Sequence, residues 1–307
     1  MVSNYVPLDV IYKYHNHRQG EEYNNYLESM AEYIFDNSKK KEFIGAKAVT
    51  FQVTEFCNLK CSYCYQICKS AQKLKIEDAK KFIDLLLTDD KSKNNYLNKD
   101  NTNAIIIDFI GGEPFLEVDL IDQILDYFFK RCIESNHPWM YNFMVSVGTN
   151  GTLYFTEKVQ KFLKKYEGRV SLAITVDGNK TLHDSCRVFH DGKGSYDLAS
   201  KAAVDWMKRT GSGSTKLTIA PENVSYLSDA IKNMINLGFT NVNENCVYED
   251  VWKLEHAQEL YRQLKDLADY MIANDLEDKI SIRLFEPIGY HPMEQEDNQN
   301  WCGGNGQ

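Results

Sequence analysis

The chain has 307 residues, enough for one large α/β domain or for a core with smaller attachments. Its 43% hydrophobic and 26% charged residues are ordinary for a globular protein, and its net charge of −9 argues against binding to phosphate backbones or anionic membrane surfaces. No apolar run approaches the ~20 residues of a membrane-spanning helix, and the N-terminus lacks the apolar core of a signal peptide. The sequence therefore predicts a cytoplasmic protein that binds neither nucleic acid nor membrane.

After an N-terminal extension over residues 1–45, segments typical of strands alternate with segments typical of helices. The predicted strands are "AVTFQVT", "NAIIIDFIGG", "YNFMVSVGTN", "VSLAITVDG", "TKLTIAP" and "TNVNENCVY". The predicted helices span 76–88, 118–134, 156–166, 194–209, 224–237 and 253–273. Six β-then-α units in sequence indicate a parallel sheet with right-handed crossovers. A barrel, a partial barrel and an open doubly wound sheet all fit this order.

Residues that suit a site follow each of the first four predicted strands. They are a cysteine cluster, Gly111-Gly112-Glu113-Pro114, Thr149-Asn150-Gly151 and Asp177-Gly178. Parallel α/β folds build their active sites just past the carboxyl ends of their strands. We therefore expect these four segments to form the functional face.

Four of the eight cysteines, Cys57, Cys61, Cys64 and Cys68, lie within twelve positions. In a reducing compartment, clustered cysteines more often bind metal than form disulfides. The spacing Cys-x3-Cys-x2-Cys can supply three corners of a cubane iron–sulfur cluster and leave one iron open. Zinc is the competing interpretation, because Cys68 could complete a four-sulfur site. The cysteine loop, residues 57–64, leaves both metals open when it is taken alone.

The cysteine loop, "CNLKCSYC", resembles the signature of radical S-adenosylmethionine (SAM) enzymes. The resemblance implies that Cys57, Cys61 and Cys64 ligate a 4Fe–4S cluster and that Tyr63 is the aromatic residue of the cofactor site. It also implies that the open iron binds SAM and that the reduced cluster cleaves SAM to a 5′-deoxyadenosyl radical. The cofactor then carries the difficult chemistry and the protein positions it. Cys68 becomes a nearby free thiol, because a fourth protein ligand would exclude SAM.

Three further segments carry the same resemblance. "GGEP" is similar to the segment that meets the amino group of SAM, which implies a cofactor-binding role for Gly111, Gly112 and Glu113. "TVDGNKTLHDSCR", residues 175–187, is similar to the segment that contacts SAM through a hydroxyl and an arginine, here Thr175 and Arg187. An arginine suits a carboxylate because its guanidinium pairs with both oxygens.

Asn150, in "GTNGTLY", is expected near the adenosine, with helix capping or turn shaping as the alternatives. His183 and Asp184 are expected to organise the loop that carries Arg187. Cys132, Cys186 and the other scattered cysteines are not part of the predicted cluster.

The combination of motifs is most similar to the SPASM/twitch branch of the superfamily, which carries auxiliary iron–sulfur clusters in a C-terminal extension. It implies a partial (β/α)6 TIM-type barrel over residues 46–250 and a C-terminal segment over 251–307. The tail "NQNWCGGNGQ" resembles the start of the extension, with Cys302 as its first ligand. The sequence as given starts this SPASM-like region without completing it.

Within that branch we expect a maturase of ribosomally made peptides that abstracts hydrogen from a precursor peptide, with thioether or related crosslinks as products. Anaerobic sulfatase maturation, which makes formylglycine, is the alternative enzyme function. A zinc-stabilised binding protein is the alternative outside enzymes. A reductant such as flavodoxin or ferredoxin is the expected electron donor. No catalytic acid or base is assigned; the weaker candidates are Asp108, Asn243, Asn245, Cys246 and Glu286.

Overall fold

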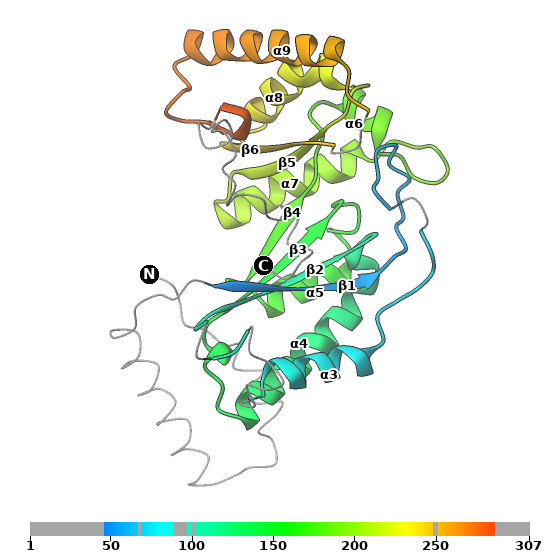
Figure 1. Ribbon diagram of the computed structural model, residues 1–307, viewed down its shortest axis with the longest axis vertical. Coiled ribbons are helices and arrows are strands. Elements are labelled where there is room, and N and C mark those ends of the chain that lie inside the picture. Colours follow the sequence, from blue (N-terminus) through cyan, green and yellow to red (C-terminus); the bar gives the residue numbers. More distant parts are fainter. Residues whose placement is uncertain (1–45, 67–68, 89–96, 100–101, 248–250, 286–307) are drawn as a thin grey trace. The chain divides into compact units, whose positions relative to one another are not determined.

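The computed structural model describes residues 46–66, 69–88, 97–99, 102–247 and 251–285 (Figure 1). The predicted N-terminal extension, Cys68, Glu286 and Cys302 lie outside these ranges. Within the described residues there are two compact units. The first unit takes its residues from Met1–Val176 and His183–Trp206, and the second unit from Asp177–Leu182 and Met207–Gln307.

The first unit is built on a four-stranded parallel sheet in the order β1-β2-β3-β4. The strands are β1 (Lys47–Thr54), β2 (Ile105–Gly111), β3 (Phe143–Thr149) and β4 (Val170–Ile174). The helices are α3 (Ile76–Leu86), α4 (Val118–Glu134), α5 (Glu157–Lys165), α6 (Lys180–Cys186) and α7 (Tyr196–Thr210), of which α6 and α7 continue into the second unit. Short 3-10 turns lie at Pro114–Glu117 and Pro138–Met140.

Alternating burial along the strands explains why this sequence forms the sheet. In β2, Ile105, Ile107 and Phe109 are at most 2% exposed, while the residues between them are half-buried. A period of two places every second side chain on the same face of the sheet. Each fully buried side chain of this size stabilises the fold by ~1.5–3 kcal/mol. This hydrophobic face fixes the strand register, because a slip of one residue would turn it toward water.

Aromatic contacts show where the helices meet the sheet. Phe51 of β1 packs edge-on against Phe82 of α3, with ring centroids 5.6 Å apart. Phe143 of β3 packs against Phe129 of α4 at 4.7 Å. The helices therefore bind the hydrophobic face, and the carboxyl ends of the strands stay open for loops.

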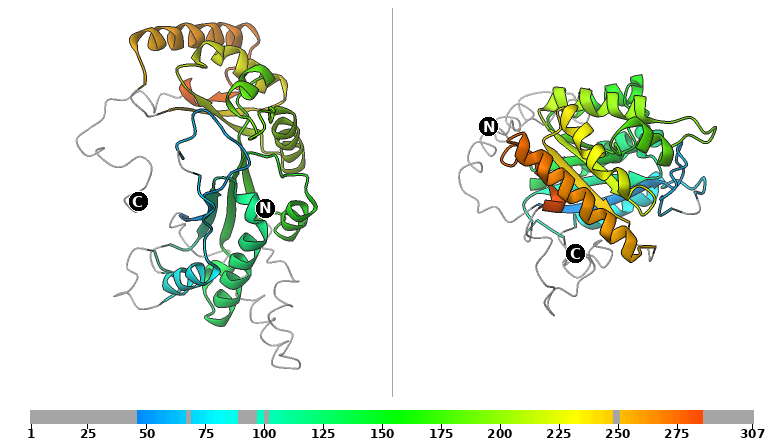
Figure 2. Two further views of the ribbon diagram at one scale, coloured as in Figure 1. Left: turned by 90° about the vertical axis from the view of Figure 1, so that its right-hand side faces the viewer. Right: turned by 90° about the horizontal axis from the view of Figure 1, so that it is seen from above.

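The second unit contains a three-stranded parallel sheet in the order β5-β6-β7. Its elements are β5 (Ser214–Ile219), β6 (Asn241–Cys246), β7 (Ser281–Ile282), α8 (Leu227–Asn236) and α9 (Leu254–Ala273), with 3-10 turns at Val224–Tyr226 and Arg283–Phe285. Figures 1 and 2 show α8 and α9 lying side by side. Leu217, Val242 and Leu267 are at most 1% exposed and belong to the core of this unit.

The α/β class and the parallel pairing are confirmed. The predicted helix 118–134 matches α4, and the other predicted helices and strands occur with shifted ends. α6 and the 3-10 turns are additions that the hydrophobic pattern did not predict. The partial barrel and the domain limits at residues 45 and 250 stay predictions. No helix in the described parts of the chain is long and apolar enough to cross a bilayer.

Two glycines hold the end of β2 close to the segment that follows β1. Gly112 N donates to Thr54 O at 2.9 Å, and a Cβ on Gly112 would lie 2.3 Å from Phe56 O. A Cβ on Gly111 would lie 2.6 Å from Thr54 O. Both contacts are with backbone atoms, which cannot swing aside as a flexible side chain can. The glycines are therefore required where the two strand ends meet.

We expect Gly112→Ala to lower the free energy of unfolding by about 1–3 kcal/mol, because the added methyl group overlaps the Phe56 carbonyl. Gly148→Ala is the matched control, since a Cβ on Gly148 would meet nothing within 4 Å. Urea unfolding of both variants measures the difference. Equal stability of the two variants would contradict this explanation of the close approach.

Candidate metal centre

The cysteine loop is held by backbone pairing with residues 186–190, here called the arginine segment. Lys60 N donates to Val188 O at 2.7 Å, and Ser62 N donates to Cys186 O at 2.9 Å. These bonds resemble a short antiparallel ladder, although the loop contains no regular strand. Two segments more than a hundred residues apart in sequence are thus joined by the backbone at the site.

The three ligand-spaced cysteines are all free thiols in this loop. Cys57 is buried, whereas Cys61 and Cys64 are half-buried. Burial raises the pKa of Cys57 and of Cys61, and hydrogen bonding from Leu59 N lowers that of Cys57 in part. A metal that binds these sulfurs as thiolates must therefore displace protons from poorly solvated thiols.

Among the described residues, no three His, Cys, Asp or Glu side chains are placed to hold a single metal ion. A cubane cluster does not need such convergence, because each thiolate binds a different iron. Soft thiolate ligands also suit iron–sulfur clusters. By the chemistry of their donor atoms, the three thiols therefore fit a 4Fe–4S cluster.

Asn58, Asn150 and Thr152 form a hydrogen-bonded group around Cys57, here called the asparagine network. Asn150 Nδ2 donates to Asn58 Oδ1 at 2.8 Å and to Cys57 Sγ at 3.8 Å. Asn150 Oδ1 accepts from Thr152 N at 3.0 Å and from Thr152 Oγ1 at 2.7 Å. Asn58 Nδ2 donates to Thr152 Oγ1 at 2.8 Å, which closes the network. The turn-shaping alternative for Asn150 is confirmed, and its contact with adenosine stays a prediction.

Glu113 is fully buried and its carboxylate is bonded inside the protein. It accepts from Thr149 Oγ1 at 2.7 Å, from Asn150 N at 2.8 Å and from Phe115 N at 3.1 Å. Its own N donates to Phe56 O at 3.0 Å. Burial raises the pKa of Glu113, while these donors and the positive charge of Arg187 oppose the rise. In this structure Glu113 joins strand ends, and its predicted contact with SAM stays a prediction.

Two predicted cofactor-binding residues, Arg187 and Tyr63, lie together in the structure. Arg187 Nη1 donates to Tyr63 Oη at 2.7 Å, and the guanidinium carbon lies 5.9 Å from the centre of the Tyr63 ring. Arg187 is only 8% exposed, and its charge lowers the pKa of Cys61 against the effect of burial. A buried cation beside the thiols favours an anionic group at this place.

His183 and Ser195 fix the arginine segment. Ser195 Oγ donates to Arg187 O at 2.8 Å and is 2.9 Å from His183 Nε2. Because the serine proton is used for the carbonyl, His183 Nε2 must carry its own proton and donate to the serine. Asp184 accepts from Tyr196 N at 2.8 Å. The predicted organising role of His183 and Asp184 agrees with these bonds.

The other predicted residues are placed as follows. Thr175 is half-buried and directly follows β4. Its N donates to Thr149 O at 3.2 Å, so the backbone pairing of β3 with β4 extends to this residue. Asp108 accepts from Thr50 Oγ1 at 3.3 Å on the less buried face of the sheet. Asn243 and Asn245 belong to β6 of the second unit.

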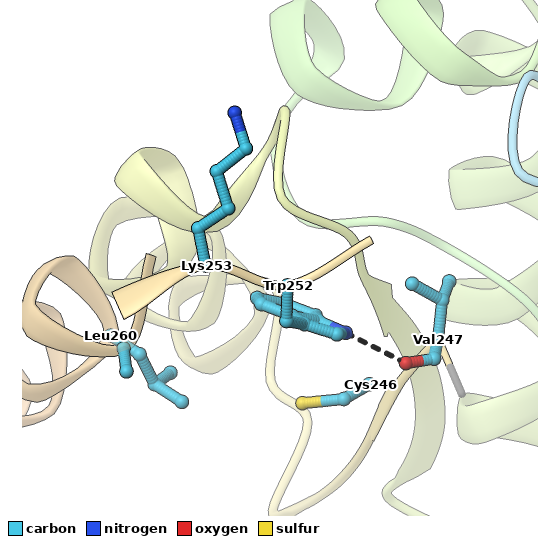
Figure 3. A pocket seen from close by; sticks show the side chains of 6 residues that line it. Cys246, Val247, Trp252, Lys253 and Leu260 are labelled. Atoms are coloured by element: carbon cyan, nitrogen blue, oxygen red, sulfur yellow. Dashed lines mark hydrogen bonds between the residues drawn. The ribbon is translucent and has the colours of Figure 1, made fainter. Parts of the chain in front are cut away.

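Cys246 also belongs to the second unit, where it lines a largely apolar cavity of about 420 Å³ at the carboxyl end of β6 (Figure 3). Trp252 also lines this cavity, and its Nε1 donates to Val247 O at 2.8 Å. Burial raises the pKa of Cys246, and the neighbouring Glu244 raises it further. The thiol is therefore held in its neutral form.

Sequence reasoning assigned no role to Asn58, Thr152 and Ser195, and it placed Thr149 on the expected functional face without giving it a role of its own. They are small polar residues in loops or at a strand end, and their partners lie up to 94 positions away. In the sequence, these residues are marked only by lying close to a motif residue. Many residues without a special role lie equally close to one.

A family model described as a 4Fe–4S single cluster domain matches residues 44–195. The chain is 27% identical over 235 residues to an uncharacterized protein of Methanocaldococcus jannaschii, covering 74% of this chain and 73% of that protein. It is 30% identical to the antilisterial bacteriocin subtilosin biosynthesis protein AlbA of Bacillus subtilis, covering 53% of this chain and 31% of AlbA. It is 34% identical to the cysteine-type anaerobic sulfatase-maturating enzyme of Clostridium novyi, covering 46% of this chain and 35% of that enzyme.

Solved structures agree on the fold. Native anSMEcpe with bound AdoMet, which is SAM, matches with a TM-score of 0.63 at 21% identity over 80% of this chain and 67% of that one. Streptococcus suis SuiB bound to precursor peptide SuiA matches with a TM-score of 0.52 at 13% identity over 85% of this chain and 54% of SuiB. The chain spans about a third of the length of AlbA and of the sulfatase-maturating enzyme.

The chain belongs to the radical SAM superfamily. Its relatives place it in the SPASM/twitch branch. A 4Fe–4S cluster and SAM are the cofactors of the radical SAM fold to which it belongs. The cysteine loop supplies three thiols, and the cation of Arg187 beside them suits an anionic cofactor group, so the residues present fit both cofactors.

We expect His183 to make the radical SAM core unstable in acid. Burial, and secondarily the charge of Arg187, lower the pKa of His183 to about 3. The unfolded chain binds a proton at this residue near pH 6.5, so stability is complete above that pH and falls as the pH drops from about 6.5 toward 3, by at most about 1.4 kcal/mol per pH unit.

Urea unfolding of the wild type and of His183→Gln at pH 7 and pH 5 measures this effect. Glutamine can still donate to Ser195 but does not titrate, so the variant should lose less stability between the two pH values than the wild type does. The same loss in both proteins would show that other groups cause the acid sensitivity.

Proposed function

We propose that the chain is the core of an iron–sulfur enzyme that uses SAM to modify a peptide. The observation that carries the proposal is the cysteine loop itself, in which three ligand-spaced thiols are fixed by the arginine segment and the asparagine network. Three thiolates would bind three irons of a 4Fe–4S cluster, so the fourth iron would have no protein ligand from this loop.

Different residues of the first unit would bind the cluster and the carboxylate of SAM. Cys57, Cys61 and Cys64 would hold the cluster. When bound and reduced, the cluster supplies the electron that cleaves SAM to methionine and a 5′-deoxyadenosyl radical. Arg187 provides a buried cation for the carboxylate of SAM, and Tyr63 orients its guanidinium.

Further contacts to SAM are proposed for Gly111, Gly112, Glu113, Asn150 and Thr175. The tight packing of the two glycines against the end of β1 keeps this edge of the sheet close to the loop. Cys302 is proposed as a ligand of an auxiliary cluster.

The relatives support a peptide substrate. AlbA is named for the biosynthesis of a bacteriocin, and SuiB is described with a bound precursor peptide. We therefore propose a maturase of ribosomally made peptides, with a thioether or related crosslink as its product. An external reductant such as flavodoxin or ferredoxin would supply the electron.

Formylglycine formation on a sulfatase is the second candidate. It is favoured by 34% identity to the sulfatase-maturating enzyme of Clostridium novyi. That alignment covers 35% of the relative, so the shared segment is the part that would bind the cofactors in either function.

We expect anaerobic reconstitution to give about four irons per chain and, with dithionite and SAM, 5′-deoxyadenosine. Cys61→Ser should lose most of the iron and all of the product, because one iron loses its thiolate. Cys132→Ala is the control, since this buried cysteine lies on α4 outside the loop. Stoichiometric zinc without SAM cleavage would contradict the proposal and support the zinc-stabilised binding protein.

Two peptides separate the candidate products. One contains several cysteines in a precursor-like sequence, and the other carries a sulfatase cysteine motif. Crosslinking removes two hydrogen atoms from the peptide, whereas formylglycine formation replaces the cysteine sulfur by a carbonyl oxygen. Mass spectrometry of both reactions identifies the product, and we expect the two-hydrogen loss. Formylglycine alone would establish the second candidate.

A further inference from the structure

The sulfur of Cys57 accepts two N–H donors. Leu59 N donates to it at 3.4 Å and Asn150 Nδ2 at 3.8 Å, distances that suit the large sulfur atom. Leu59 lies two residues along the cysteine loop, so its bond is local. Asn150 lies 93 positions away, at the end of β3, so the fold brings this second donor to the sulfur.

The asparagine network fixes the direction of the Asn150 amide. Asn150 Oδ1 accepts two hydrogen bonds, both from Thr152. Besides the bond to Cys57, Asn150 Nδ2 donates a second hydrogen bond to Asn58 Oδ1. Exchanging the oxygen and nitrogen of Asn150 would place two acceptors or two donors against each other at these contacts. The donor end of the amide is therefore the end that faces Cys57. Asn150 is only 5% exposed, so water does not compete strongly for it.

The backbone of Asn150 is fixed as well. Its N donates to the buried carboxylate of Glu113 at 2.8 Å. The side chain and the main chain of this residue are thus both held by partners inside the first unit. A donor held in this way loses little freedom when it binds a sulfur that carries more charge.

We propose that Asn150 is a positioning residue that raises the reduction potential of the cluster by donating an N–H···S bond to the Cys57 thiolate. This inference rests on the proposed cluster at the cysteine loop. Reduction adds one electron from the external reductant to the cluster and releases nothing, so the negative charge on the cluster and its sulfurs increases. An N–H donor stabilises the more negative state, and hydrogen bonds to the sulfurs are among the factors that set such potentials.

The role is distinct from shaping the turn. Turn shaping uses Oδ1 and Thr152, whereas the proposed role uses Nδ2 and Cys57. A residue that acted only on the turn would affect folding or cluster assembly and leave the potential of an assembled cluster unchanged.

The test is a redox titration of the reconstituted full chain without SAM, followed by electron paramagnetic resonance. Asn150→Leu keeps the approximate size of the side chain and removes the donor. We expect the ratio of reduced to oxidised cluster at a fixed potential to fall about threefold to tenfold, where tenfold corresponds to about 59 mV for one electron. Asn223→Leu is the matched control, because Asn223 is also a buried asparagine that accepts from a backbone N–H, in the second unit; its potential should equal that of the wild type.

An unchanged potential in Asn150→Leu with full iron content, or an equal fall in Asn223→Leu, would overturn the inference while leaving the proposed function intact. Absence of iron from the wild type would instead overturn the proposed function. If Asn150→Leu assembles no cluster, a spectroscopic measurement on the wild-type protein tests the inference instead. Electron–nuclear double resonance of the reduced protein, labelled with nitrogen-15 in the asparagine side-chain amides, should show coupling to the label and to an exchangeable proton. Lack of that coupling would overturn the inference.

Discussion

The buried carboxylate of Glu113 ties together the strand ends on which the candidate site is built. Through its own N it binds the segment after β1, and through its two oxygens it binds the hydroxyl and the N–H that end β3. A carboxylate without such partners would cost several kcal/mol to bury. Here three donors satisfy it, and charge-assisted bonds of this kind are stronger than neutral ones. The strand ends are consequently kept at a fixed separation beside the cysteine loop.

Everything else in the site follows from that fixed separation. The end of β3 delivers Asn150 to Cys57, and the close packing of Gly112 on Phe56 O leaves no freedom for the first part of the loop. The arginine segment then closes the loop from the other direction by backbone pairing. A loop without regular secondary structure is thus held by backbone and side-chain bonds from two other segments of the first unit.

The site combines two kinds of electrostatic environment within a few residues. Burial disfavours the thiolate of Cys57 and of Cys61, whereas Arg187 and the N–H donors favour it. The positive charge of Arg187 would offset the negative charge of thiolate ligands and so reduce their repulsion of an anionic cofactor group. His183 stays neutral in the same environment because it is buried beside a cation. The charge states of the thiols, of Arg187 and of His183 therefore matter to the site as much as their positions do.

The α/β class, the parallel pairing of the strands and the position of the cysteine loop were all predictable from the sequence alone. Strands such as β2 and helices such as α4 were predictable because their burial pattern follows the period of the backbone, which is a local property. Cys57, Cys61 and Cys64 stand out in the sequence because metal ligands on one loop need a restricted spacing, and their role as cluster ligands stays a prediction. α6 was missed, since a helix of seven residues is too short to show a clear period.

The contacts that each motif residue makes became visible only in the folded protein. The resemblance implied a cofactor-binding role for the glycines of "GGEP", and the structure shows that a Cβ on either one would overlap a backbone oxygen of Thr54 or Phe56. Asn58 and Thr152 entered the site only when β3 was placed beside the cysteine loop. Hydrogen bonds between residues ninety positions apart depend on the packing of whole strands, and no periodic pattern in the sequence encodes them.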